Sequence, residues 1–94
     1  MDAKEKLYAL LNDFYNSRMG IELFCRMFSD TFRLEIEYDC LSEIEYKLFG
    51  ELSRIAYGYT DNTEDLANCP QYYFSDKQVV AKFEDVVKKL QLFL

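Results

Sequence analysis

Histidine is absent from this chain of 94 residues, and glycine, proline and cysteine are scarce. Without histidine, the chain lacks the commonest general base and the commonest metal ligand of proteins. A Ser-His or Cys-His nucleophile and any zinc site that contains histidine are therefore excluded. The three glycines lie at positions 20, 50 and 58, so they form neither a G-x-G-x-x-G motif nor a phosphate-binding loop.

The three cysteines, Cys25, Cys40 and Cys69, are widely spaced and form no C-x-x-C pair. This spacing predicts reduced thiols and excludes a zinc site made of four thiolates from one chain. The first residues, MDAKEKL, lack the apolar run of a signal peptide, and no stretch reaches the roughly 18 apolar residues of a membrane span. We therefore expect a cytoplasmic protein without a membrane segment, a metal or another cofactor.

Hydrophobic residues, by contrast, make up half of the chain, and they include eight phenylalanines and eight tyrosines. This composition can fill a core and differs from that of disordered proteins. A chain of this length forms one domain, which we expect to span residues 1–94. Because Pro70 is the only proline and glycines are few, helix breakers are rare, which is typical of a helical protein.

Capping boxes mark two helix starts. Ser42 precedes Glu45 by three residues, Ser75 precedes Gln78 by the same spacing, and apolar residues flank each pair where a hydrophobic staple would form. A weaker version of this signal begins at Asp2. The sequence therefore predicts helices that begin just after these three residues.

Apolar stripes with helical spacing complete the helices. They predict one helix from about residue 3 to Arg18, a second from Ile21 to about Phe32, a third from Ser42 to about Tyr59, and a fourth from about residue 76 to Leu90. Cys25 falls on the second stripe and is expected in the core, and Gly50 is expected where a neighbour packs closely. The predicted fold is all-α, a small antiparallel four-helix bundle with one long connection.

Two connections remain. In the first, apolar and acidic residues alternate with the period of an extended segment. We expect Leu34, Ile36 and Tyr38 to point inward, and the acidic residues between and after them to point outward. The second connection, residues 60–74, should contain one short helical turn near residues 62–66, and at least one of Tyr72 and Tyr73 should face outward.

Negative charge is concentrated in the middle of the chain. The net charge is −6, but residues 30–76 alone carry eleven acidic and three basic residues, whereas residues 1–29 are neutral and residues 77–94 carry +2. Direct binding to nucleic acid or to an anionic membrane is disfavoured because their phosphates would be repelled. A basic protein surface would be attracted.

The densest acidic stretch is LEIEYDCLSEIEY, residues 34–46, which contains five acidic residues and no basic one. A pair of carboxylates can catalyse glycoside hydrolysis, but this needs a cleft for which a small helical domain has little room. A calcium loop fails because Cys40 stands where glycine is needed and Tyr46 stands where the bidentate glutamate belongs. Capping and the helix dipole account for Glu43 and Glu45. The other three acids form either a solvated surface or a patch for a basic partner.

A pattern of aromatic, acidic and capping residues covers nearly the whole chain: LEIEYDCLSEIEYKLFGELSRIA, then TEDL, then PQYYFSDKQV and an amphipathic C-terminal helix. This succession resembles the colicin D immunity protein-like family, which includes immunity proteins of contact-dependent growth inhibition systems. The resemblance implies an all-α protein that neutralises a bacterial toxin, in the best-known case a nuclease that cleaves tRNA, by covering its basic active site with acidic residues.

These observations predict a non-enzymatic, toxin-neutralising immunity protein that binds a toxin domain, expected to be a basic ribonuclease. The predicted main contacts are Glu35, Glu37, Asp39, Glu43 and Glu45, and the second contact region comprises Asp61, Glu64, Asp65, Tyr72 and Tyr73. The alternative is a helical protein-interaction or regulatory domain without a toxin, which would form homo-oligomers. Either a monomer or a homodimer of the free protein is compatible with the sequence.

Overall fold

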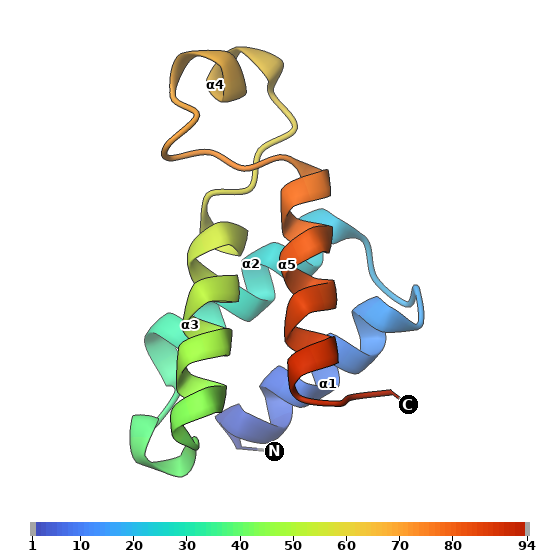
Figure 1. Ribbon diagram of the computed structural model, residues 1–94, viewed down its shortest axis with the longest axis vertical. Coiled ribbons are helices and arrows are strands. Elements are labelled where there is room, and N and C mark those ends of the chain that lie inside the picture. Colours follow the sequence, from blue (N-terminus) through green and yellow to red (C-terminus); the bar gives the residue numbers. More distant parts are fainter. Residues whose placement is uncertain (1, 94) are drawn as a thin grey trace.

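The computed structural model describes residues 2–93, which fold into five α-helices joined by turns (Figure 1). The helices are α1 (Ala3–Tyr15), α2 (Ile21–Asp30), α3 (Glu43–Tyr57), α4 (Thr63–Asn68) and α5 (Asp76–Lys89), with a π-helical turn at Thr31–Glu35 and a 3-10 turn at Tyr38–Cys40. Within residues 2–93 the only β-type pairing is an isolated parallel bridge between Tyr59 and Phe74. The predicted all-α class is therefore confirmed.

The helix starts lie where the capping signals predict them. Ser42 and Ser75 each accept a hydrogen bond from the backbone N–H three residues later, and Glu45 and Gln78 each accept one from the capping residue's N–H, so both capping boxes are complete. Asp2 caps α1 by accepting a hydrogen bond from the backbone N–H of Glu5, at 2.8 Å. These side chains satisfy N–H groups that would otherwise lack a partner.

One predicted boundary is wrong. The first helix ends at Tyr15 rather than Arg18 because Ser17 adopts a left-handed conformation (φ 58°) that turns the chain. The second helix, α2, ends at Asp30, close to the predicted Phe32, and leads directly into the π-helical turn Thr31–Glu35.

That turn also overturns the extended segment predicted over residues 34–38. Only Ile36 and Glu37 have extended backbone, and of the three apolar side chains expected to point inward only Ile36 is partly buried. Leu34 is 73% exposed and Tyr38 is 50% exposed.

The core is formed by the apolar stripes of α1, α2, α3 and α5, together with Phe32 of the π-helical turn. Aromatic rings dominate its centre, where Phe24, Phe28 and Phe49 are fully buried. Phe14 stacks on Phe24 with ring centroids 4.4 Å apart. The predicted position of Cys25 in the core is confirmed, and burial raises the pKa of its thiol to about 12.

Helices α3 and α5 lie side by side in Figure 1, while α1 and α2 cross behind them at an angle. The finer prediction of a regular antiparallel four-helix bundle is therefore not confirmed. The close neighbour expected at Gly50 is Phe32: a Cβ at Gly50 would lie 3.5 Å from the Phe32 Cζ atom. Among the described residues, no helix combines the length and the apolar character needed to cross a membrane.

One segment projects from this body. Residues 59–74, which include α4, extend beyond the adjacent ends of α3 and α5 at the top of Figure 1, and we refer to them as the lobe. The lobe is closed at its base by the Tyr59–Phe74 bridge, in which the Thr60 N–H donates to the Phe74 carbonyl at 3.0 Å and the Phe74 N–H donates to the Gly58 carbonyl at 2.9 Å. No residue of α4 is buried, so the lobe contributes no side chain of that helix to the core.

Candidate functional site

The predicted contact residues fall into two groups at opposite ends of α3. The first group surrounds the 3-10 turn and the start of α3, whereas the second lies in the lobe beyond its end (Figure 1). Since α3 has 15 residues, its ends lie about 22 Å apart at a rise of about 1.5 Å per residue. A partner that touches both groups must therefore also pass over the side of α3 between them.

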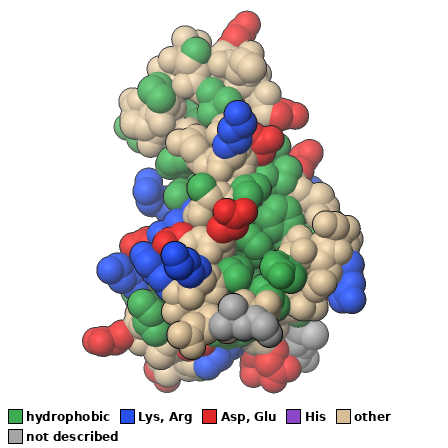
Figure 2. Space-filling model, turned by 45° about the vertical axis from the view of Figure 1, so that its right-hand side comes forward, with side chains coloured by type: hydrophobic (Ala, Val, Ile, Leu, Met, Phe, Trp, Pro, Cys, Tyr) green, Lys and Arg blue, Asp and Glu red, His purple; other side chains and the backbone are tan. Residues whose placement is uncertain are grey.

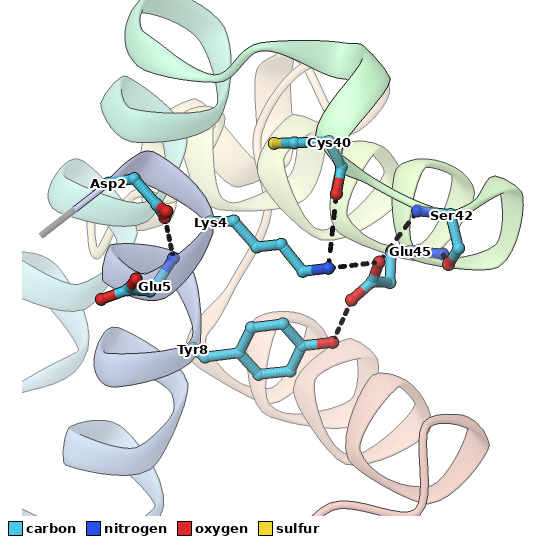
Figure 3. A network of polar contacts seen from close by, with 7 residues as sticks. All are labelled: Asp2, Lys4, Glu5, Tyr8, Cys40, Ser42 and Glu45. Atoms are coloured by element: carbon cyan, nitrogen blue, oxygen red, sulfur yellow. Dashed lines mark hydrogen bonds and ion pairs between the residues drawn. The ribbon is translucent and has the colours of Figure 1, made fainter.

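Glu45 has an internal role that sequence reasoning captured only in part. The residue is 8% exposed, and its carboxylate accepts hydrogen bonds from the Ser42 N–H at 2.9 Å and from the Tyr8 hydroxyl, while the Lys4 ammonium lies 3.4 Å away (Figure 3). Lys4 also donates to the Cys40 carbonyl at 3.3 Å. The carboxylate thus joins α1 to the start of α3, a position in which it cannot meet a partner directly.

This environment shifts two pKa values in opposite directions. Burial alone raises the pKa of Glu45, but hydrogen bonds from Ser42 and Tyr8 and the positive charge of Lys4 outweigh burial and lower it overall. Burial, followed by the bond to the Glu45 carboxylate, raises the pKa of the Tyr8 hydroxyl. Glu45 is therefore a charged group that supports the fold, and the Tyr8 hydroxyl donates a hydrogen bond to it.

The other four acids of the first group are exposed. Glu35 is partly neutralised because the Lys6 ammonium lies 3.0 Å from its carboxylate. Glu37, Asp39 and Glu43 make no ion pair within 4.0 Å to another residue among 2–93, and we call these three the acidic end.

In the lobe, hydrogen bonds between residues close in sequence hold the second group in place. Asn62 caps α4 by accepting from the N–H groups of Glu64 and Asp65 at 2.8 and 3.2 Å, and the Thr60 hydroxyl donates to the Asp65 carboxylate at 3.4 Å. Asp61 and Glu64 are exposed, whereas Asp65 is half-buried. The prediction that Tyr72 or Tyr73 faces outward is confirmed, since Tyr72 is 68% exposed.

Exposed tyrosines connect these two groups along α3. We call Tyr38, Tyr46, Tyr57 and Tyr72 the tyrosine face; each is about half exposed or more. The rings of Tyr38 and Tyr46 lie 5.2 Å apart, and both pack near Phe32. Tyr46 and Tyr57 are on the same helix at a spacing that places them on one side of it.

Two arginines complete this surface. The Arg33 guanidinium lies 4.1 Å above the ring of Tyr57, and that of Arg54 lies 5.5 Å from the ring of Phe74, both within the range of cation–π contacts. Arg54, Tyr57, Tyr72 and Phe74 line a hollow of about 690 Å³ at the base of the lobe. Tyrosine and arginine are the residue types most enriched at the energetic centres of protein interfaces.

Sequence reasoning missed most of this surface, although a signal for it was present. Tyr46 and Tyr57 lie off the apolar stripe of the third predicted helix, which indicates that they face solvent. Leu34 was expected in an extended segment with its side chain pointing inward, so its exposure was not foreseen.

The acids do not gather into a metal site among residues 2–93, where no three side chains of histidine, cysteine, aspartate or glutamate are placed to hold an ion. What the arrangement offers chemically is a surface for a macromolecule: aromatic and guanidinium groups at the centre, with carboxylates at each end.

Comparisons with known proteins add no relative. No protein-family model, no curated protein and no solved structure matches this chain. The similarity to the colicin D immunity protein-like family thus stays a prediction that rests on the sequence pattern.

Proposed function

We propose that this protein is a cytoplasmic immunity protein that has no enzymatic activity and neutralises a bacterial toxin domain, a basic ribonuclease, by covering its active site. The observation that carries the proposal is the tyrosine face, open to solvent and bounded by the acidic end on one side and by the acids of the lobe on the other. The resemblance to the colicin D immunity protein-like family supports the same function.

In the proposed complex the acidic residues and the tyrosines have different roles. Glu37, Asp39 and Glu43 take the place of RNA phosphates in the cationic groove of the toxin, and their charge accelerates the encounter. The tyrosines provide the apolar anchors, which lose contact with water in the complex. Glu45 acts behind the surface by fixing the start of α3 that carries Glu43.

The lobe makes the second contact in this proposal. Asp61, Glu64 and Asp65 offer further carboxylates, while Tyr72 and Tyr73 stand beside the hollow that Arg54 lines. Arg33 and Arg54 add positive charge to a surface that is otherwise acidic. This favours a partner that has acidic residues at the matching positions. Such a pattern contributes to specificity more than to affinity.

Co-expression tests the function. The toxin encoded directly upstream of the gene is produced in cells with and without this protein, and growth is followed. We expect growth to be restored when this protein is present and a stable complex to be recovered by affinity purification. Cells that die equally fast in both cultures would rule the proposal out.

Charge reversal then tests the surface. Glu43→Lys should slow association with the toxin, most strongly at low ionic strength. The matched control is Glu22→Lys, because Glu22 is also an exposed acid in the first turn of a helix but lies on α2. Both variants lose the same favourable contact with a helix dipole, so stability falls equally. Equal loss of toxin binding in the two variants would place the contact elsewhere.

The second candidate function is an interaction or regulatory domain without a toxin. The tyrosine face would serve it equally well, because hot spots of tyrosine and arginine are common to many interfaces. The co-expression experiment separates the two candidates, since only the immunity protein protects cells from a toxin.

A further inference from the structure

An apolar groove lies between α5, the end of α1 and the C-terminal tail. Its volume is about 610 Å³, and its walls include Phe14 at the end of α1, Met19 in the segment that follows, Val80 and Val87 on α5, and Leu92 in the tail. Figure 2 shows hydrophobic side chains gathered in a band right of the centre of the view. No residue of the groove belongs to the tyrosine face or to the acidic end.

Two helix ends of the same kind frame this groove. At the end of α1, Ser17 has φ 58° and its N–H donates to the Phe14 carbonyl at 3.1 Å, while the Arg18 N–H donates to the Asp13 carbonyl at 2.8 Å. This is the Schellman pattern of hydrogen bonds.

The end of α5 repeats the pattern, with Gln91 at φ 55° and the Leu92 N–H bonded to the Val87 carbonyl at 2.9 Å. Beyond it, the ring of Phe93 stacks on that of Tyr15 with centroids 4.5 Å apart. The walls of the groove are therefore held by backbone hydrogen bonds and ring stacking before anything binds there.

Two charges of opposite sign stand at the rim. Glu84 and Lys88 both line the groove, are exposed, and lie one helical turn apart on α5. Neither makes an ion pair within 4.0 Å to another residue among 2–93. Other charged residues on α5 are paired, because Lys82 and Lys89 both form ion pairs with Asp85. The rim thus presents one unpaired positive and one unpaired negative charge beside an apolar hollow.

We propose that this groove is the interface of a homodimer in which two copies of α5 meet antiparallel around a two-fold axis. An axis midway between Glu84 and Lys88 sets Glu84 of each copy against Lys88 of the other, so both pairs form at once. Such self-complementarity is what a two-fold interface requires. The apolar walls lose contact with water in the same step.

Charge at this face also allows a second copy to approach. The charged side chains that line the groove, Glu84 and Lys88, cancel each other, although the whole chain carries −6. Contact through the acidic end would bring like charges together. The dimer leaves the acidic end and the tyrosine face uncovered, so it does not depend on the function proposed above.

Sedimentation equilibrium over a concentration series tests the dimer. We expect the wild-type protein to dimerise, and Glu84→Lys and Lys88→Glu each to weaken the dimer about tenfold, since each change turns two attractive pairs into two repulsive ones. A mixture of the two variants should restore the affinity, because the lysines of one chain then face the glutamates of the other. Restored affinity also shows that both variants fold.

A matched control uses Glu22→Lys and Arg26→Glu, which lie one turn apart and exposed on α2. These variants should dimerise like the wild type. The proposal is overturned if the wild-type protein has a dimer dissociation constant above about 1 mM, which is the range of non-specific contact. It is also overturned if the α5 variants dimerise normally, or if their mixture remains as weak as each variant alone.

Discussion

The helical body and the lobe use their residues in different ways. In the body, α1, α2, α3 and α5 each place an apolar stripe in one core, and rings such as Phe28 and Phe49 are completely buried. In the lobe, α4 has no buried residue and the base is held by the two hydrogen bonds of the Tyr59–Phe74 bridge. The comparison teaches that buried packing is concentrated in the body, while the side chains of α4 in the lobe remain at the surface.

Removing a ring from the body should have the largest effect. Phe49 is fully buried and makes edge contacts with Tyr8 and Phe28 at centroid distances of 5.4 and 5.9 Å. Phe49→Ala is expected to lower the free energy of unfolding by about 3–5 kcal/mol, because it leaves a cavity. Urea denaturation followed by circular dichroism measures it. Tyr57→Ala, on the same helix but 65% exposed, is the control and should cost far less; similar costs would erase the distinction between core and surface on α3.

The junction between body and lobe should come next. A Cβ at Gly58 would lie 2.5 Å from the Tyr72 carbonyl oxygen and 2.9 Å from the Phe74 Cδ2 atom, so Gly58→Ala must displace the base of the lobe. We expect a loss of about 1–3 kcal/mol in thermal or urea denaturation.

Gly50→Ala is the matched control, since its Cβ meets Phe32 at an ordinary contact distance of 3.5 Å. This control should be neutral or stabilising by up to about 1 kcal/mol, because alanine is the better helix former. The same sign for both substitutions would contradict the tight packing at the base of the lobe.

The buried carboxylate of the body gives a smaller effect that depends on pH. Glu45→Gln keeps a residue that can close the capping box, as Gln78 does in α5, but it removes the charge that faces Tyr8 and Lys4. We expect a loss of about 1–2 kcal/mol at neutral pH.

The sign with pH follows from the lowered pKa of Glu45. Its contribution is complete above the unfolded-state pKa, near 4.3, and is lost as the pH falls through the lower folded-state value. The stability difference between variant and wild type should therefore shrink below about pH 4, as urea denaturation across a pH series will measure. A constant difference would indicate that the charge is not what stabilises the junction.

Thiol labelling compares the two regions without changing stability. Cys25 in the body is 2% exposed, and burial raises the pKa of its thiol to about 12, whereas Cys69 in the lobe is half-buried and Cys40 is exposed. Native protein treated with a thiol reagent should modify Cys40 first, then Cys69, and Cys25 only after unfolding. Labelling of Cys25 at the rate of Cys69 would mean that the body opens as readily as the lobe.

Local signals were sufficient to predict most of the body. Capping boxes and apolar stripes involve residues that are close together in the sequence. The helix starts after Ser42 and Ser75 and the core position of Cys25 could therefore be predicted directly. The π-helical turn at Thr31–Glu35 could not be predicted in this way, because residues 34–38 have the alternation of an extended segment. One extra residue in the turn changes which side chains face outward, and Leu34 was misplaced for that reason.

The candidate site was predictable only in its charges. Glu37, Asp39 and Glu43 are exposed as expected, but the partners of Glu35 and Glu45 come from α1, 29 and 37 residues away along the chain. Pairings over such distances depend on how helices pack and leave no trace in a local pattern. Tyr46 and Tyr57 were within reach, since their positions off the apolar stripe of α3 already indicated exposure.

The closed base of the lobe has a consequence for how such a protein diversifies. Because Tyr59 and Phe74 join the two ends of the lobe directly, substitutions at its tip leave the packing of the body untouched. New combinations of residues at the exposed positions of the lobe, such as Asp61 and Glu64, can therefore be sampled with little loss of stability, whereas Asn62 and Asp65 keep the hydrogen bonds that hold α4. A library randomised there on a constant scaffold would explore recognition almost independently of folding.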